Sequence, residues 1–274
     1  MVATELLQRA RRADPLAGVW EAADVQWAWR KPRQSDEVDT LFWFDDEGPV
    51  AGVVLTSWAD EPWQCDPIVI PGASDPEPAE VFARAVEHAA TFSPDGFDVP
   101  VGDDDKVFTH SAQSSALVRG HQDNTGWLDV ANRPPLVTPA EGFVIVDRTQ
   151  RQGTPHHMRH RNGERVAERL AECPLYDPEL DLAVEGIGGQ FAGNSLYWFD
   201  PSTRTGLVEP VGVEDEYRRR GLARAMLCAG IDRLATRGAE RVKISWESEA
   251  AGALYLGIGF RQTSTTTWWR GSAG

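Results

Sequence analysis

Three adjacent arginines, residues 218–220, stand directly before Gly221 and Ala223. Residues 209–213 before them have the pattern of a strand, and the residues after Gly221 have helical spacing, so the arginines lie in a strand-to-helix loop. The first amides of a helix have no acceptors within it and lie at the positive end of its dipole. Such a loop binds anions, and the added cations predict a guest with several phosphate oxygens, such as a pyrophosphate.

A second pattern follows at residues 251–260, which read Ala-x-x-Leu-Tyr-x-x-x-Gly-Phe. Together with Arg-x-x-Gly-x-Ala at residues 218–223, it resembles the two ordered signatures of the GNAT acetyltransferase superfamily. The plan of the whole chain is similar to that of tandem members with one active and one degenerate repeat, such as the mycothiol synthase family.

The resemblance implies that acetyl-CoA, as cosubstrate, lies in a cleft between two splayed parallel strands, residues 211–213 and 242–246. The backbone of the first strand would bind pantetheine, and the loop amides would bind the pyrophosphate. The residues expected to contact acetyl-CoA are Val211, Val213, Arg218, Arg219, Arg220, Gly221, Leu222, Ala223 and Ser248. At Ser248 the family often has asparagine, so one contact at the start of the following helix differs.

Acyl transfer from a thioester to an amine needs a neutral amine, a donor for the developing oxyanion and a proton for the leaving thiolate. The resemblance implies that Tyr255 is the acid, and core packing is the alternative role for this tyrosine. Glu209 is the candidate base, because it shares strand parity with Val211 and Val213. It either takes the amine proton or only binds and orients the substrate. The backbone amide near Val213 is expected to face the oxyanion.

In this superfamily the segments before the central strands select the acceptor. These segments are here His156, His157, Met158, Arg159 and His160, then Tyr176, and then Tyr197, Trp198 and Phe199. The three histidines suggest a metal, but no paired cysteine or carboxylate spacing completes a site. We therefore predict no metal site, and the histidines either contact the substrate or the other domain, or serve local structure.

The chain has 274 residues, with 27 Lys+Arg and 42 Asp+Glu, and its formal net charge is −15. This charge argues against a nucleic-acid partner. Residues 1–135 hold 10 basic and 24 acidic residues, whereas residues 136–274 hold 17 and 18, so nearly all of the negative charge lies in the first half. The acidic half either only keeps the protein soluble or attracts a cationic acceptor.

Neither a membrane segment nor a disulfide framework is predicted. No apolar run approaches the roughly 20 residues of a membrane helix, and residues 1–12 have no apolar signal core. The three cysteines, Cys65, Cys173 and Cys228, are far apart and odd in number. We expect a soluble cytoplasmic protein in which Cys228 is a small buried residue of a helix.

A stiff connector divides the chain, because Pro134, Pro135 and Pro139 fall close together. We predict domains at 1–135 and 136–274. The second should contain strands at 142–146, 180–185, 191–199, 206–213, 242–246 and 263–269, and helices at 163–173, 222–237 and 250–256. The expected fold class is α/β (α+β), with two GNAT-like domains, each a mixed, mostly antiparallel sheet with a central splayed parallel pair flanked by helices.

The first half has a similar order of elements. We expect strands at 41–45, 67–70, 97–101 and 126–130, and helices at 78–90 and 106–119. Residues 41–45, LFWFD, echo residues 196–200, LYWFD, which indicates a divergent duplication. Where the anion loop should be, residues 71–78 carry prolines without N–H groups and acids that repel phosphate. We predict that this half is degenerate and that the chain binds one acyl-CoA.

The sequence as a whole predicts an acetyl-CoA-dependent N-acetyltransferase. It would move an acetyl group to a primary amine of a small molecule by direct attack in a ternary complex. Two alternatives stay open: acetylation of a protein N-terminus or lysine, and a non-catalytic acyl-CoA-binding sensor. No nucleic-acid or membrane partner is expected, and the sequence specifies neither the acceptor nor the oligomeric state.

Overall fold

The protein divides into two compact units that do not follow the order of the chain. The computed structural model describes residues 2–58, 61–93 and 95–272. The first unit takes the residues up to 28, residues 32–124 and those from 264 onward, and the second takes residues 29–31 and 125–263. Each unit has a hydrophobic core of its own.

The division differs from the boundary at residue 135 that the prolines indicate. The last strand, β11 (Arg261–Gly271), leaves the second unit at residue 264 and pairs antiparallel with β4 (Phe97–Gly102) of the first unit. Sheets are joined by hydrogen bonds between residues far apart in the chain, and the composition of a connector does not report such bonds. The structure therefore divides the chain at residue 125 and assigns the C-terminal strand to the first unit.

The second unit is built on a mixed sheet with the strand order β5-β10-β9-β8-β7-β6. The pairs β6–β7, β7–β8 and β8–β9 are antiparallel, whereas β9 and β10 are parallel. The strands are β5 (Val118–Asp129), which enters this unit at Thr125, β6 (Phe143–Asp147), β7 (Asp181–Gly186), β8 (Phe191–Asp200), β9 (Thr205–Val213) and β10 (Arg241–Trp246). The predicted parallel pair within a mixed sheet is confirmed.

The long helix of this unit, α7 (Leu222–Thr236), is delimited by two glycines in the left-handed region. Gly221 precedes it with φ 75°, and Gly238 follows its end with φ 94°. A third glycine, Gly230, lies inside the helix because Tyr197 of β8 packs there: a Cβ on Gly230 would lie 2.0 Å from the tyrosine ring. The close approach holds α7 against the sheet.

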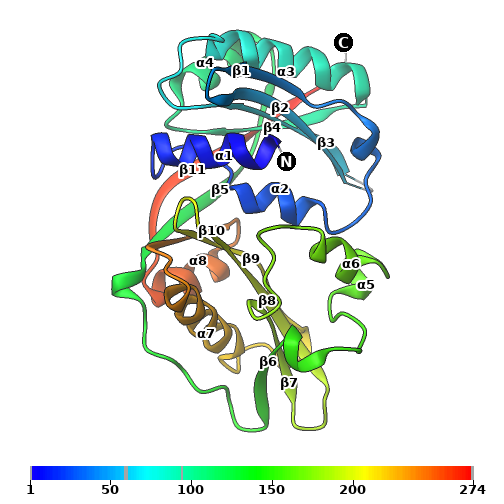
Figure 1. Ribbon diagram of the computed structural model, residues 1–274, viewed down its shortest axis with the longest axis vertical. Helices are drawn as coiled ribbons and strands as arrows, with labels where there is room; N and C mark the ends of the chain where they lie inside the picture. The colour runs from blue at the N-terminus through cyan, green and yellow to red at the C-terminus, as the bar shows by residue number, and fades with distance from the viewer. Residues whose placement is uncertain (1, 59–60, 94, 273–274) are drawn as a thin grey trace. The chain divides into compact units, whose positions relative to one another are not determined.

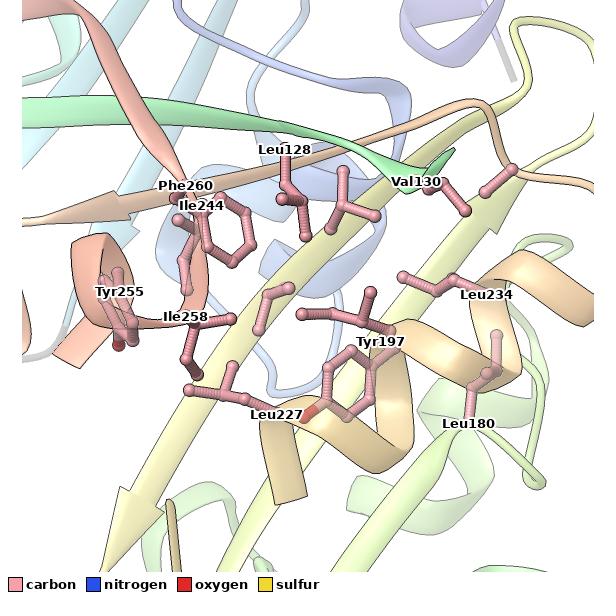
Figure 2. Packing of buried hydrophobic residues seen from close by; sticks show 14 of the residues in the cluster. Leu128, Val130, Leu180, Tyr197, Leu227, Leu234, Ile244, Tyr255, Ile258 and Phe260 are labelled. Atoms are coloured by element: carbon pink, nitrogen blue, oxygen red, sulfur yellow. The ribbon is translucent and has the colours of Figure 1, made fainter. Parts of the chain in front are cut away.

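The main core of the second unit lies where α7, α8 (Glu249–Ile258) and the strands meet (Figure 2). Leu227 and Leu234 of α7 and Tyr255 and Ile258 of α8 belong to the same buried cluster. The two helices therefore share one core, and the side chain of Tyr255 is part of it.

Consecutive residues of β8 point to opposite faces of the sheet, as the strand period requires. Tyr197 faces α7, whereas the ring of Trp198 packs edge-on against Tyr176, with ring centroids 6.1 Å apart. In Figure 1, α7 lies on one side of β8 and β9, and the short helices α5 (Arg159–Asn162) and α6 (Val166–Ala171) lie on the other side.

The first unit repeats the plan of the second. Its strand order is β1-β2-β3-β4-β11, with β1 to β3 antiparallel and β3 and β4 parallel. The remaining strands are β1 (Leu41–Asp45), β2 (Gly48–Trp58) and β3 (Glu61–Val69), and the helices are α1 (Val2–Ala13), α2 (Ala22–Ala28), α3 (Pro78–Phe92) and α4 (Lys106–Ser114). The succession β1-β2-β3-α3-β4 corresponds to β7-β8-β9-α7-β10.

The sequence echo between residues 41–45 and 196–200 does not mark equivalent strands. Residues 41–45 form β1, which corresponds in topology to β7, whereas residues 196–200 end β8, which corresponds to β2. This mismatch explains why the two segments lie at different distances from the long helix that follows each of them. The repeat is visible in the topology and not in this pair of segments.

Other elements differ in length from the expectation. The expected helix 106–119 ends at Ser114, because Ala116 takes a left-handed φ of 55° and β5 then begins at Val118. The expected helix 163–173 shortens to α6, and the expected strand 67–70 is the end of β3. Cys228 is fully buried in α7, as predicted. Among the described residues, no helix is long and apolar enough to span a bilayer.

Candidate active site

Strands β9 and β10 separate after a short parallel contact. Residues 205–207 of β9 pair with residues 241–243 of β10, and within the described chain the pairing does not continue along residues 208–213 and 244–246. The splayed parallel pair that was predicted is therefore present. Val211 and Val213 lie on the separated part of β9.

The loop between β9 and α7 exposes its backbone where the helix begins. Apart from Gly221 itself and its two chain neighbours, no heavy atom of the described residues lies within 4 Å of the position that a Cβ on Gly221 would take. Arg219 is also left-handed, with φ 65°, a conformation that residues other than glycine rarely adopt. Helix α7 begins without a side-chain cap, so the amides of its first turn, including those of Leu222 and Ala223, are free to bind an anion.

The three arginine side chains of this loop are exposed but have different surroundings. Arg218 forms an ion pair with Asp215 at 2.7 Å. The Arg220 guanidinium lies 5.7 Å from the centre of the Tyr217 ring. Arg219 makes no hydrogen bond or ion pair with any residue that the structure describes. The predicted anion site would therefore be formed first by backbone amides, and Arg219 is the arginine side chain whose lack of a described partner leaves it able to join them.

Tyr255, the predicted acid, lies in the core of the second unit and is only 8% exposed. Its ring meets that of Trp246 edge-on, with centroids 5.9 Å apart. Burial, and then the negative charge of Glu209, raise the pKa of Tyr255 to about 12. The phenol therefore carries its proton at neutral pH, and the charge of Glu209 contributes to holding it there.

Strand β9 contains a bulge at Glu209. The register with β8 shifts between the pairs Tyr197–Val208 and Ser195–Val211, so that β9 holds one more residue than β8 in this interval. A bulge interrupts the alternation of side chains. Strand parity therefore does not establish that Glu209 lies on the face of Val211, and that placement stays a prediction.

Ser248, one of the residues expected to contact acetyl-CoA, caps helix α8. Its hydroxyl oxygen accepts the N–H of Ala251 at 3.2 Å, which satisfies one of the free amides at the start of the helix. The hydroxyl keeps its own proton to donate. Val211 and Val213 are partly buried beside the cores. Contacts of these three residues with acetyl-CoA stay predictions.

The histidine segment folds over a buried carboxylate. Asp181 of β7 is fully buried, and one of its oxygens accepts hydrogen bonds from His156 Nε2 at 2.9 Å and from the Tyr176 hydroxyl at 2.8 Å. His157 Nε2 lies 3.0 Å from the other oxygen. Burial alone would raise the pKa of Asp181, but the interactions with His156 and His157 hold it well below its usual range.

His156, His157 and Asp181 bring together three atoms of the kinds that bind metals. No local spacing in the sequence indicates this group, because Asp181 lies 25 residues from His156. The N–H of Met158 donates to His156 Nδ1 at 3.2 Å, so the ring proton lies on Nε2 and is donated to Asp181. A protonated Nε2 does not bind a metal, and His156 is therefore committed to holding the carboxylate.

Two of the residues expected to line the acceptor site are instead core residues. Tyr197 and Trp198 are both fully buried, and the Tyr197 hydroxyl donates to the carbonyl oxygen of Met226 at 2.8 Å. The expectation that they contact the acceptor is wrong, because the aromatic strand packs against structure on both of its faces. Phe199 is partly buried against the same core.

The first unit has no equivalent of the arginine loop. Its helix α3 begins with Pro78 in the first turn, and Glu77 precedes it without forming a side-chain cap. A proline lacks the N–H group that a phosphate would need, and Asp75 and Glu77 add negative charge. These features support the prediction that the first unit does not bind acyl-CoA through such a loop.

Residues 150–260 match the Acetyltransferase (GNAT) family, so this segment is similar to GNAT acetyltransferase domains. A mycothiol acetyltransferase of Clavibacter michiganensis subsp. michiganensis is 32% identical over 117 residues, which cover 43% of this chain and 37% of that protein. A mycothiol acetyltransferase of Clavibacter sepedonicus is 29% identical over 133 residues, 48% of this chain and 42% of that protein. The match thus spans less than half the length of these relatives.

Solved structures share the fold over nearly the whole chain. A tandem GNAT protein from the clavulanic acid biosynthesis pathway has a TM-score of 0.70 at 14% identity and covers 99% of this chain and 94% of its own. A GCN5-related N-acetyltransferase from Sphaerobacter thermophilus has a TM-score of 0.65 at 16% identity, with 99% and 92% covered. The predicted fold class, two GNAT-like domains, is confirmed.

Proposed function

We propose that this chain is an acetyl-CoA-dependent N-acetyltransferase that transfers an acetyl group to the primary amine of a small molecule. The observation that carries the proposal is the separation of β9 from β10, beside a helix α7 that begins without a side-chain cap. Glu209 lies on the separated part of β9, and its charge acts on the buried, protonated phenol of Tyr255. Acyl transfer to an amine requires a proton acceptor and a proton donor, and these two residues are the candidates. The match of residues 150–260 to an acetyltransferase family supports the same reaction.

The residues of the arginine loop fit the charged part of acetyl-CoA, which supplies the acetyl thioester. The amides of Leu222 and Ala223, together with the exposed Arg219, offer donors and positive charge for a pyrophosphate. Gly221 leaves the space beside them open, since among the described residues only its chain neighbours could lie within 4 Å of a Cβ at this position. The backbone of β9 around Val211, which pairs with β8 but not with β10, would hold the pantetheine amides.

The two candidate catalytic residues would move two protons. Glu209 accepts a proton from the attacking amine as the new carbon–nitrogen bond forms. Tyr255 gives its proton to the sulfur as the carbon–sulfur bond breaks. The products are an amide and a free thiol, and the enzyme is restored when the proton on Glu209 returns to Tyr255 through solvent.

The charge of Glu209 would couple these two proton transfers. A phenol with a pKa of about 12 is a poor donor to a thiolate, because thiols have pKa values of about 8.5. Part of that high pKa comes from the negative charge of Glu209. When Glu209 takes the amine proton, this contribution disappears and the phenol becomes a stronger acid. Tyr255 thus becomes the better donor at the moment when the thiolate leaves.

The acceptor is proposed only as a class. The curated relatives are mycothiol acetyltransferases, and they cover too little of the chain to transfer their substrate. Nearly all of the net negative charge of the protein lies in residues 1–135, so a cationic amine is the form that would gain most from the field of the protein. Affinity for such an acceptor should weaken steeply with added salt.

The proposal is tested by measuring thiol release from acetyl-CoA over a set of small amines and of peptides with free N-termini or lysines. Tyr255→Phe should lower kcat by about 100-fold and leave the Kd for acetyl-CoA, measured by calorimetry, unchanged. The control is Tyr197→Phe, which removes a hydroxyl from the same core and should leave kcat near its original value.

Full activity in Tyr255→Phe would show that Tyr255 is not the acid that protonates the thiolate. Thiol release with peptides alone would favour a protein acetyltransferase. Acetyl-CoA binding with no release over the whole set would favour a sensor.

A further inference from the structure

The first unit contains a partly open cavity of about 320 Å³. It lies where β3 and β4 separate: their parallel pairing is limited to residues 63–64 and 97–98, and the cavity is lined by residues 67–70 and 100–102 beyond that contact. The position corresponds to the gap between β9 and β10 in the second unit. A volume of this size is at the lower end of the range for small-molecule sites.

The walls of the cavity are mainly apolar. Among the residues that line them are Trp20, Ile68, Ile70, Val101, Val107 and Phe108. Pro71 and Pro78, which also line the cavity, have no N–H group to offer to a phosphate. The cavity therefore suits an apolar body and does not suit the charged part of acyl-CoA.

One wall is an indole that is held in place by hydrogen bonding. Trp20 Nε1 donates to a carboxylate oxygen of Asp66 at 2.9 Å, and Asp66 also accepts from Gln64. The ring of Trp20 also packs edge-on against the ring of Trp268, with ring centroids 6.2 Å apart. A fixed indole can present its face to a bound cation, which binds well to tryptophan.

The charged groups that line the cavity favour a cation. Asp104 and Asp105 both belong to its lining, and Asp105 uses one oxygen to accept the N–H of Phe108 at the start of α4. Arg11 also lines the cavity, but its guanidinium forms a buried ion pair with Glu21. The positive charge of Arg11 is compensated within the protein, and the two aspartates leave the cavity negative.

We propose that this cavity binds a small, mainly apolar amine in its protonated form, such as an arylalkylammonium ion, and that it does not bind acyl-CoA. The apolar body would contact the walls, and the ammonium group would lie near Asp104 and the face of Trp20. This site belongs to the first unit alone, and the proposal is independent of the reaction assigned to the second unit.

The test is calorimetric titration of the full chain with 2-phenylethylamine at pH 7, beside 2-phenylethanol, which has the same shape without the charge. The amine should bind saturably and about tenfold more tightly than the alcohol. Asp104→Asn should weaken the amine about threefold and leave the alcohol unchanged. Asp46→Asn, at an exposed aspartate in the β1–β2 turn that does not line the cavity, should change neither.

A second pair of variants separates this cavity from any amine site in the second unit. Ala10 of α1 lines the cavity, whereas Ala3 of the same helix does not. Ala10→Phe should abolish the binding of the amine, and both Ala3→Phe and Tyr255→Phe should retain it. Equal affinity for amine and alcohol, binding that survives Ala10→Phe, or displacement of the amine by acetyl-CoA in the Ala10-dependent site would each overturn the proposal.

Discussion

The indole Nε1 of Trp198 donates a hydrogen bond to the carbonyl oxygen of Glu209 at 3.0 Å. Trp198 is fully buried and Glu209 lies in the bulge of β9, so a core residue holds the stretch of backbone that carries the proposed base. A bulge re-aims the side chains of its strand. This bond therefore links the packing of β8 to the direction of the Glu209 carboxylate.

Trp198→Phe is expected to lower kcat by about tenfold, because it frees the backbone that positions Glu209. It should also lower the free energy of unfolding by about 2 kcal/mol, through the lost hydrogen bond and the smaller ring. The Kd for acetyl-CoA should not change. Steady-state kinetics and urea denaturation measure these effects. A variant that loses stability but keeps its kcat would show that the bond has only a structural role.

Gly221→Ala is expected to weaken acetyl-CoA binding by about tenfold, because the added Cβ enters the space beside the anion-binding amides and costs about one charge-assisted hydrogen bond. It should also cost about 1 kcal/mol of stability, since alanine disfavours a left-handed φ. Gly238→Ala is the matched control. Gly238 is also left-handed and open to solvent, so its variant should lose the same stability and keep its affinity. Equal affinities in the two variants would contradict the assignment of the loop.

Much of the second unit could be predicted from its sequence, because local patterns specify its elements. Helix α7 has apolar spacing and a glycine at each end, and its strands alternate between short turns. Less of the first unit could be predicted from its sequence. Helices α1 and α2 carry no motif, and β2 begins with Gly48 and Pro49, which do not indicate a strand. The unit to which β11 belongs is determined by its pairing with β4, and no local sequence pattern indicates that pairing.

In the candidate site, too, some features follow from local sequence patterns and others depend on contacts between distant residues. The loop at Gly221 and the tyrosine of α8 follow from spacing along the chain, and in the folded protein the charge of Glu209 acts on Tyr255. The bulge at Glu209 and the carboxylate of Asp181 beneath the histidines depend on contacts between separate strands and loops. For this reason, strand parity could not place Glu209, and the spacing of the histidines did not reveal the carboxylate beside them.

Asp181→Asn is expected to lower the free energy of unfolding by about 3 kcal/mol at pH 7, because it removes a buried charge that His156 and His157 hold. The folded-state pKa of Asp181 is lowered, so its contribution is present above the unfolded value of about 3.9 and is lost as the pH falls below it. The difference between wild type and variant should therefore shrink as the pH falls from about 5 to 2. Urea denaturation across this range measures it, and a constant difference would contradict an ionised Asp181.

Asp66 in the first unit should have the opposite pH dependence. Burial raises its pKa to about 7, although hydrogen bonds from Gln64 and Trp20 limit the rise. The folded state therefore holds the proton more tightly than the unfolded chain does. The stability that this proton provides is complete below the unfolded pKa of about 3.9 and is lost as the pH rises through about 7.

The wild type should accordingly lose about 2 kcal/mol of unfolding free energy between pH 5 and pH 7.5 that Asp66→Asn does not lose, because asparagine cannot ionise and still accepts the N–H of Trp20. Urea denaturation at several pH values, followed by a signal from the first unit, measures the two curves. Parallel curves would mean that Asp66 is already ionised at pH 5. Diverging curves would mean that the carboxyl that holds Trp20 against the cavity changes its charge near neutral pH, and the affinity of the cavity for an amine should then rise from pH 5 to pH 7.5.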